Sequence, residues 1–516
     1  MREAQSTIGE DMKMIRQNTL GAVALAAALA HGLPAAAAGF TLAGPVATNR
    51  YEQAPFKWHI TPRHDYSKTF VTKLGLCQAG FDGEYLGKFK VRDNGTREVE
   101  MTCEEALEII RGMDMITLGL PKIVYLVGWQ YNGHDSKYPA FFEGNAAIAR
   151  KGDKNPLDSV RWLMREAKKY HTTVSLHICL FDAYADSPLF EEYRKADVLA
   201  RNADGSLRQG DWGYKVCYAA EWEKGLLQKR VDRLCELLPI RDAGTIHVDA
   251  FHNAVPSPSV DADGKVSFEY LTPVSPWHGY THEQDLEAKR KIIGYFDGKG
   301  IDVTTEGIQG MDVGAGWFPM YWCFNSPWHA LHLSAQQACG GMMKFTEGAL
   351  FGDNVNAECV FSAYRNDKAK AFAEFKRGFC EKTLIAQFLN RFGRKELLAG
   401  ADGWILEFED GVRTMLKGGV LSVAQGDALL AEGGDVFMPA GWLGDRAVVA
   451  YSANGYADRV WTVPPGVELS GSVRGWTVNA TGLKPFKGFS VAGRRVTISL
   501  ASGQMVVLKG RRSTDR

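Results

Sequence analysis

The chain has 516 residues, and its hydrophobic content of 45% excludes a disordered protein and is enough for about two to four globular domains. Its 60 basic residues balance 60 acidic residues, so the charge indicates neither nucleic-acid binding nor attraction to an anionic membrane surface. The 13 tryptophans are numerous and several stand beside polar residues, a setting that favours sugar binding as much as ordinary core packing.

An export signal is predicted at the N-terminus. Lys13 and Arg16 precede an apolar, alanine-rich run from Leu20 to Leu33, and small residues at 36–38 form a cleavage site. The run is short for a membrane-spanning helix, and no cysteine suited to a lipid anchor stands at the cleavage site. Residues 1–38 are therefore expected to be a signal peptide with an upstream extension, and the mature protein to be secreted or periplasmic, from a bacterium and without a membrane anchor.

After a lead-in segment at 39–67, apolar strands alternate with amphipathic helices over residues 68–395. Repeated βα units predict an α/β fold, a (β/α)8 TIM-type barrel. A doubly wound open sheet is the alternative, and the barrel is preferred because the clusters of polar and aromatic residues all follow strands. Strands are expected at 71–77, 122–127, 173–180, 244–250, 301–305, 318–324 and 349–352. Helices are expected at 103–113, 155–170, 220–238, 282–299, 369–378 and 381–391.

A different pattern follows the barrel. Short alternating strands separated by turns predict a small antiparallel β-sandwich over residues 396–510, followed by a frayed tail at 511–516. Glu409–Gly411 and Asn454–Gly455 are expected to be hairpin turns. The domain carries no distinct sugar-binding motif, so its expected role is structural. Its strands are expected at 404–408, 412–416, 447–452, 460–463, 475–478, 495–500 and 505–508.

No motif predicts a metal ion or a cofactor. The nine cysteines form no CxxC pair, which argues against zinc, and buried free thiols are favoured over one or two disulfides. Asp261–Gly264 resembles part of a calcium loop but lacks the remaining ligands, so it is interpreted as a turn, and a structural calcium has no motif to support it. No P-loop, Rossmann fingerprint, nucleophile elbow or HExxH helix is present.

Two acidic residues stand at the ends of successive predicted strands. Asp249 ends the strand at 244–250, and Glu306 follows the strand at 301–305, one βα unit later. The carboxyl ends of parallel barrel strands face the active site. Because neighbouring strands lie about 4.8 Å apart, the two carboxyl groups are expected near the ~5–5.5 Å separation of a retaining glycosidase. The structural alternative for Asp249 is a cap of the following turn.

The neighbours of each acid predict its role. Asp249 stands beside His and Asn residues and should stay ionised, as a nucleophile must. Glu306 is followed by Gly307 and is close to Trp317 and Trp322, which should desolvate it and raise its pKa, as a general acid requires. Asp249 is therefore predicted to be the nucleophile and Glu306 the acid/base.

Further polar and aromatic residues are predicted to bind the substrate. The loop at 128–139 carries His134 and Asp135, which suit sugar hydroxyls, together with Trp129 as a stacking platform. A polar surface loop is the alternative interpretation of this segment. The remaining candidates follow other strands and would form walls of the sugar site: Asp182, Trp212, His252, Trp317 and Trp322.

Several motifs, in order along the chain, resemble a known family. Gly133–Ser136, Ile246–Asn253, Val303–Glu306 and Gln387–Phe392 are similar to the catalytic barrel of endo-α-N-acetylgalactosaminidases, glycoside hydrolase family 101, and of the related α-N-acetylgalactosaminidases of family 129. Residues 437–455 resemble the start of that family's β-domain behind the barrel. Each motif is short, so the resemblance depends on the ordered set, which extends from about residue 72 to residue 463.

The resemblance implies a retaining hydrolase of α-linked N-acetylgalactosamine in mucin-type O-glycans, acting on an O-glycan or a glycoprotein. It places the nucleophile at Asp249, the acid/base at Glu306 and a sugar-binding carboxylate at Asp135. Two features depart from the family. The segment at 255–280 is longer than expected, and Phe251-His252 stands where the family has Trp-Gly.

These departures leave two alternatives open. One is an exo-acting α-glycosidase on another α-galactoside or α-GalNAc substrate, because the substrate-binding architecture decides between endo and exo action. The other is a non-catalytic, exported glycan-binding protein on a barrel scaffold, although the presence of both acids argues against it.

Overall fold

The computed structural model describes residues 40–50, 61–82, 92–210, 212–251, 256–260, 266–270, 275–306, 318–319, 327–332, 335–336 and 346–511. The predicted signal peptide and the candidate residues His252, Trp317 and Trp322 lie outside these ranges. None of the helices within the ranges combines the length and the apolar character that crossing a membrane requires. The seven cysteines within them are all free thiols.

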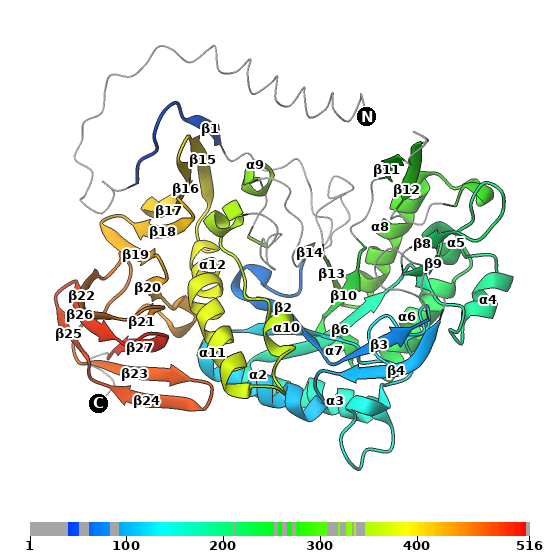
Figure 1. The fold of residues 1–516 in the computed structure, drawn as a ribbon, viewed down its shortest axis with the longest axis horizontal. Helices are drawn as coiled ribbons and strands as arrows, with labels where there is room; N and C mark the ends of the chain where they lie inside the picture. The colour runs from blue at the N-terminus through cyan, green and yellow to red at the C-terminus, as the bar shows by residue number, and fades with distance from the viewer. Residues whose placement is uncertain are drawn as a thin grey trace.

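A parallel sheet forms the centre of the N-terminal part (Figure 1). Each pair of neighbouring strands is parallel, and the strands follow one another across the sheet in chain order. This order agrees with the predicted βα units. The strands are β2 (Phe70–Gly75), β5 (Lys122–Val127), β6 (Thr172–Cys179), β10 (Thr245–Asp249), β13 (Asp302–Thr305) and β14 (Phe318–Pro319).

The parallel sheet is strongly curved. In a flat sheet β2 and β13 would lie about 19 Å apart, since four spacings of about 4.8 Å separate them. In the structure, Nζ of Lys73 on β2 lies 2.8 Å from Oε1 of Glu306, directly after β13. Likewise, the hydroxyl of Tyr125 on β5 lies 2.6 Å from Oγ1 of Thr245 on β10. The sheet therefore wraps around a polar interior. Among the described strands its edges, β2 and β14, do not pair, and the closed (β/α)8 barrel stays a prediction.

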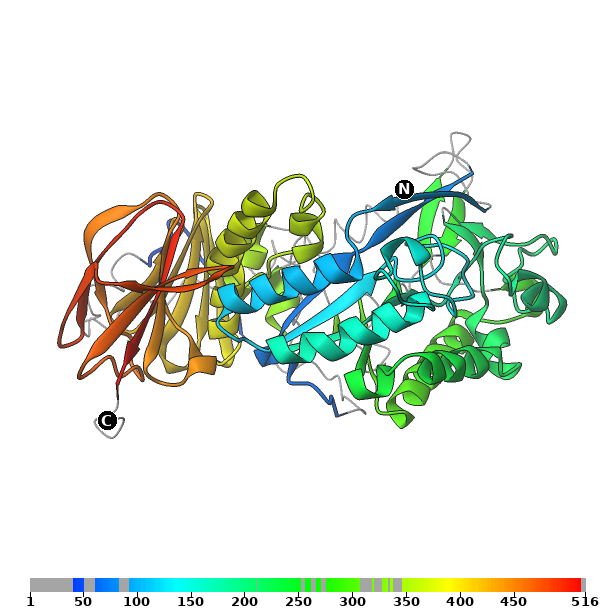
Figure 2. The same ribbon diagram turned by 90° about the horizontal axis from the view of Figure 1, so that it is seen from below.

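Helices pack against this sheet, and Figure 2 shows α2 and α3 lying side by side along it. Helix α2 (Cys103–Thr117) begins with a capping box between Thr102 and Glu105, and α3 (Pro156–Glu166) begins with Asn155 as its cap and a proline in its first turn. The other helices are α4 (Phe190–Lys195), α5 (Tyr218–Glu223), α6 (Leu226–Leu237), α7 (Ile240–Ala243), α8 (His282–Gly298), α9 (Pro327–Leu331), α10 (Ala357–Phe361), α11 (Lys368–Gly378) and α12 (Leu384–Leu389).

Two predicted elements of this part differ from the structure. The strand expected at 349–352 is wrong, since Thr346–Phe351 forms a 3-10 helix. Its alanine and glycine residues have low strand propensity, so their apolar character alone did not indicate a strand. The single helix expected at 220–238 is two helices, α5 and α6. Gly225 separates them with a left-handed backbone, φ 70°, that a continuous right-handed helix excludes.

Short antiparallel sheets follow the carboxyl ends of the parallel strands. Their strands are β3 (Cys77–Phe81) with β4 (Asp93–Val99); β7 (Asp182–Ala183), β9 (Gly213–Lys215) and β8 (Gln209–Gly210); and β11 (Pro256–Val260) with β12 (Val266–Tyr270).

The C-terminal part is a large antiparallel sheet with a three-stranded sheet packed on it, at the left of Figure 1. Between the two sheets, the ring of Trp461 stacks on Phe437 at 5.6 Å. The first strand of the large sheet, β1 (Ala47–Arg50), comes from the lead-in segment. The rest are β15 (Arg394–Gly400), β16 (Gly403–Phe408), β17 (Val412–Lys417), β18 (Val420–Gln425), β19 (Ala428–Glu432), β20 (Asp435–Pro439), β21 (Ala447–Ser452), β27 (Gln504–Gly510), β23 (Val473–Asn479) and β24 (Gly482–Phe486). The small sheet contains β22 (Tyr456–Thr462), β26 (Arg495–Leu500) and β25 (Phe489–Ala492).

The two predicted hairpin turns have different outcomes. Glu409–Gly411 joins β16 to β17, which pair antiparallel, so this hairpin is confirmed. Asn454–Gly455 does not form a hairpin. It joins β21 to β22, and β21 pairs with β20 and β27 whereas β22 pairs with β26. The chain crosses between the two sheets here because Trp461 on β22 is buried in the core between them.

Candidate active site

The structure brings Asp249 and Glu306 together at the carboxyl ends of β10 and β13, which are paired neighbours. A carboxylate oxygen of Asp249 lies within 4.8 Å of one of Glu306. Two carboxyl groups this close oppose each other's ionisation, so the pKa values of the two groups depend on each other.

Lys73 lies beside this pair and was not among the residues predicted from the sequence. Its side chain on β2 is 4% exposed, and its Nζ forms an ion pair with Oε1 of Glu306 at 2.8 Å. A lysine is seldom fully buried unless it is paired. The sequence signal that could have found it is a single charge within the buried strand Phe70–Gly75, but the partner lies 233 residues away.

The charges around the pair act differently on its two carboxyl groups. Burial opposes ionisation of Glu306, but the Lys73 ammonium and then His247 outweigh it and lower the pKa of Glu306 to about 2. Burial, and next the negative charge of Glu306, raise the pKa of Asp249 well above its ordinary value. Both pKa directions are opposite to those expected from the neighbours in sequence, because Lys73 stabilises the ionised form of Glu306.

Two histidines lie beneath the carboxyl pair in the interior of the sheet. Nε2 of His177 on β6 lies 3.8 Å from Oδ2 of Asp249, and its ring stacks on His247 at 5.2 Å. Nδ1 of His247 lies 2.9 Å from Oγ1 of Thr304. Burial, and next the positive charge of Lys73, lower the pKa of His177 well below its ordinary value. His177 is therefore a neutral polar group below Asp249.

The loop after β5 brings His134 and Asp135 to the same place. The backbone N–H of His134 donates to the carbonyl of Cys77 at 2.9 Å, and a Cβ on Gly133 would lie 2.7 Å from that oxygen. Asp135 is 4% exposed and has a left-handed backbone, φ 61°. Its charge also raises the pKa of Asp249. Strained, buried polar residues of this kind concentrate at functional sites.

Asp93 on β4 holds this loop from its other side. Its carboxylate accepts hydrogen bonds from Oγ of Ser136 at 2.6 Å and from Nδ2 of Asn132 at 2.8 Å. Lys137 lies 3.4 Å from the same carboxylate. The loop that carries Asp135 is therefore fixed to β3 by its backbone and to β4 by its side chains.

The structure places the other predicted binding residues differently. Trp129 is fully buried, and its indole N–H donates to the carbonyl of His177 at 3.0 Å, so it supports the interior and has no face open to a sugar. This corrects the predicted stacking role of Trp129. Asp182 forms a buried ion pair with Lys215 at 2.7 Å. Trp212, in the turn between β8 and β9, is 42% exposed.

Among the described residues, two sets of donor atoms are close enough to be compared with metal sites: His134, His177 and Asp249, and His247, Asp249 and Glu306. Both sets include Asp249. In the second set, the Lys73 ammonium also occupies Oε1 of Glu306. We assign neither set to a metal ion, and the absence of a cofactor stays a prediction.

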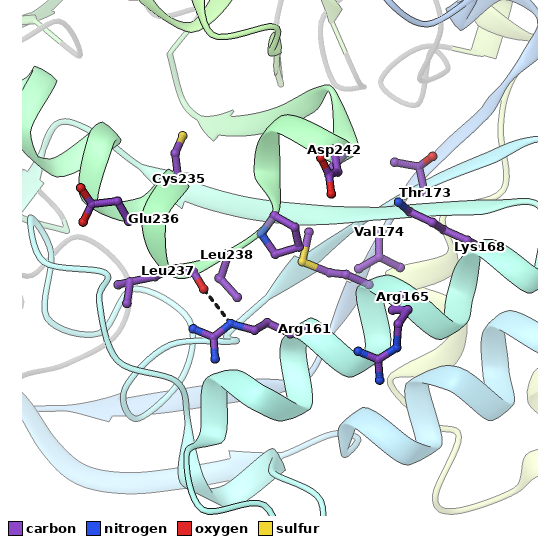
Figure 3. A pocket seen from close by; sticks show the side chains of 13 residues that line it. Arg161, Arg165, Lys168, Thr173, Val174, Cys235, Glu236, Leu237, Leu238 and Asp242 are labelled. Carbon is purple, nitrogen blue, oxygen red and sulfur yellow. Dashed lines mark hydrogen bonds between the residues drawn. The ribbon is translucent and has the colours of Figure 1, made fainter.

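The cavity drawn in Figure 3 lies at the opposite end of the parallel sheet. Its volume is about 430 Å³, and its lining includes Thr173 and Val174 at the amino end of β6. Arg161 on α3 crosses it and donates to the carbonyl of Leu237 at 2.8 Å. This cavity is therefore separate from the carboxyl pair, which follows the other ends of the strands.

Comparison with protein families finds one match within the chain. Residues 98–258 match the family model of glycoside hydrolase family 101, described as endo-alpha-N-acetylgalactosaminidase. This confirms the family resemblance predicted from the motifs. The matched range contains Asp135 and Asp249 and ends before Glu306. A comparison with curated proteins finds no match.

A comparison with solved structures returns several glycosidases, three of which follow. An alpha-N-acetylgalactosaminidase from Bifidobacterium bifidum, in complex with Gal-NHAc-DNJ, is 12% identical with a TM-score of 0.49; the match covers 69% of this chain and 57% of that one. An Anoxybacillus alpha-amylase is 9% identical with a TM-score of 0.41, over 87% of this chain and 100% of that one. An alpha-galactosidase from Thermus thermophilus is 15% identical with a TM-score of 0.25, over 38% and 35%.

Proposed function

We propose that the protein is a secreted, retaining glycoside hydrolase that cleaves α-linked N-acetylgalactosamine in O-glycans, with Asp249 as nucleophile and Glu306 as acid/base. The observation that carries the proposal is a pair of carboxyl groups, with oxygens within 4.8 Å of each other, after two adjacent parallel strands. The family match of residues 98–258 supports the choice of sugar.

The spacing of the pair supports retention over inversion. An inverting enzyme keeps its carboxyl groups about 6.5–9.5 Å apart so that a water molecule fits between its base and the sugar. Oxygens of Asp249 and Glu306 lie within 4.8 Å of each other. This spacing suits direct attack by a carboxylate on the anomeric carbon.

The reaction then has two displacement steps. In the first, Asp249 bonds to the anomeric carbon while Glu306 protonates the glycosidic oxygen, and the bond to the aglycone breaks. In the second, Glu306 takes a proton from water, the water oxygen bonds to the anomeric carbon, and Asp249 leaves as a carboxylate. Two inversions give an α-configured product.

The first step needs a proton on Glu306 and an ionised Asp249, whereas the surroundings lower the pKa of Glu306 and raise that of Asp249. The proton therefore has to pass from Asp249 to Glu306, and oxygens of the two groups lie within 4.8 Å of each other. A bound sugar favours it, because positive charge developing at the anomeric carbon stabilises the ionised form of Asp249 more than that of Glu306.

Asp135 is the proposed sugar anchor. Its loop is held by β3 and β4, so its carboxylate is positioned before a substrate arrives. His134 adjoins it, with Nε2 3.4 Å from Oδ1 of Asp135. Neighbouring hydroxyl groups of a sugar suit this carboxylate and imidazole.

A screen of aryl α-glycosides and of the α-linked Gal-β1,3-GalNAc disaccharide, with NMR of the product anomers, tests the proposal. We expect turnover of the α-GalNAc substrates with the α-anomer formed first. A β-anomer formed first would exclude retention, and free GalNAc without disaccharide would exclude endo action in favour of the exo-acting alternative. The export part predicts that protein recovered outside the cytoplasm lacks residues 1–38, which its intact mass measures.

A further inference from the structure

We propose that Lys73 is a positioning residue for Glu306, and that its ammonium holds this carboxylate against Asp249 at the spacing that the two-step reaction needs. The inference rests on the proposed function, which it deepens by assigning a third residue to the carboxyl pair. The ion pair at 2.8 Å, formed across the interior of the curved sheet, is the observation that supports it.

The strand register places Lys73 in that interior. Lys73 lies opposite Tyr125 on β5, and cross-strand neighbours point to the same side of a sheet. The ring of Tyr125 lies 5.4 Å from that of His247, which is inside the curve. The side chain of Lys73 therefore extends inward from β2 toward the far wall, where β13 ends at Glu306.

Lys122 is a second buried lysine, and its contacts are those of a purely structural residue. Lys122, at the start of β5, donates to Oδ1 of Asp114, Oγ1 of Thr117 and the carbonyl of Leu120. All three acceptors lie within eight residues of it, at the opposite end of the sheet. Lys73 instead pairs with a carboxylate 233 residues away that faces a second acid.

The groups around Lys73 explain why its charge is needed. Neutral His177 faces it from β6, and His247 and Asp249 lie on β10, beside Glu306 after β13. The loop after β5 adds His134 and Asp135. Without the ammonium, burial would oppose ionisation of Glu306 with less positive charge to outweigh it, and the pKa of Glu306 would rise. The Glu306 carboxyl group would also lose the ion-pair partner that holds it beside Asp249.

The test compares Lys73→Met with the matched control Lys122→Met, which also removes a buried, ion-paired lysine. For Lys73→Met we expect kcat on an aryl α-GalNAc to fall by about 10–100-fold with KM changed less than about threefold, and the acid limb of the kcat/KM profile to move to higher pH by at least about one unit. For Lys122→Met we expect a lower Tm and an unchanged pH profile. Lys73→Arg keeps the charge, and its pH profile should match that of the wild type.

Two results would overturn the inference: an unchanged kcat and pH profile in Lys73→Met, or the same shift in Lys122→Met. If Lys73→Met does not fold, a shifted pH profile in folded Lys73→Arg would also overturn it. A protein that turns over no α-glycoside would contradict the proposed function instead. In that case, 13C NMR of the Glu306 carboxyl group tests the role of Lys73, with the signal assigned by its loss in Glu306→Gln. The titration of Glu306 should move to higher pH in Lys73→Met. An unchanged titration of Glu306 would contradict the role of Lys73.

Discussion

Strand β13 starts with one buried acid, Asp302, and is followed by another, Glu306, and the two have opposite surroundings. Oδ2 of Asp302 accepts from the backbone N–H of Arg63 at 2.8 Å and from the hydroxyl of Tyr66 at 3.1 Å, while its Oδ1 pairs with Arg63. Glu306 pairs with Lys73 but also faces the carboxyl group of Asp249. At the amino end of the strand, the carboxylate of Asp302 accepts several hydrogen bonds. At the carboxyl end, Glu306 lies beside a second acid, Asp249.

The difference distinguishes a carboxylate that stabilises the fold from one that takes part in the reaction. A carboxylate that accepts several hydrogen bonds from a cation and a hydroxyl stabilises the fold through those bonds. Two acids that share a proton raise the free energy of the folded state, and such pairs persist where chemistry needs them. The amino end of the sheet is therefore expected to control stability, and the carboxyl end to control turnover.

Asp249→Asn is expected to have the largest effect of these changes, and the effect should be on turnover. Losing a covalent nucleophile should lower kcat by at least about 10³-fold. The Tm should stay about equal, because burial and the charge of Glu306 already disfavour the ionised form of Asp249, and the amide is likewise uncharged. Steady-state kinetics and thermal unfolding measure both effects. A variant that keeps a tenth of the wild-type kcat would contradict the role of Asp249. If the protein is instead a glycan-binding protein without activity, Asp249→Asn would keep its affinity for the glycan, and neither protein would show turnover.

Glu306→Gln should lower kcat by about 10²–10⁴-fold for a substrate with a poor leaving group, the range of general acid–base catalysis. Substrates with an acidic phenol as leaving group need less protonation, so their glycosylation step should be affected less. Measuring two aryl α-glycosides with leaving groups of different pKa gives the ratio. Equal losses in that step for both substrates would argue against Glu306 as the proton donor.

Asp302→Ala should affect only stability. Removing this buried carboxylate takes an acceptor from the backbone N–H of Arg63 and from the hydroxyl of Tyr66, and the free energy of unfolding should fall by about 1–3 kcal/mol. Asp297→Ala is the matched control: Asp297 also pairs with Arg63, but its side chain is 37% exposed, so the loss should stay below about 1 kcal/mol. Denaturant unfolding measures both variants, and kcat per folded molecule should match that of the wild type.

The smallest expected effect concerns the shape of the kcat/KM profile against pH. Between the lowered pKa of Glu306, about 2, and the raised pKa of Asp249, the carboxyl pair holds the single proton that the reaction uses. Activity should therefore fall as pH rises through the raised pKa of Asp249, whereas no acid limb should appear above about pH 3. An acid limb near pH 4–5 in the wild type would contradict the ion pair with Lys73.

Local patterns were sufficient for the strands of the parallel sheet and for the positions of both acids. Asp249 and Glu306 each end an apolar strand, and the parallel neighbours β10 and β13 bring them together as expected. The same patterns were not sufficient for Trp129. A tryptophan in a polar loop suggested a sugar platform, but the loop folds inward and buries its ring.

The protonation of the pair could not be predicted from neighbours in sequence. His and Asn residues beside Asp249 suggested that it stays ionised, while the side chain that sets the charge comes from β2. A pKa depends on burial and on charges within a few ångströms, and neither quantity follows from spacing along the chain.

The sequence by itself determined the succession of βα units, the change to antiparallel strands, the two acids and the family resemblance, because strand periodicity and motif order are properties of short segments. Only the tertiary structure decided that β1 from the lead-in segment joins the C-terminal sheet, and that Lys73 meets Glu306. Both contacts depend on the path of the whole chain. The second also depends on the curvature of the sheet, which brings β2 and the end of β13 within the reach of one lysine side chain.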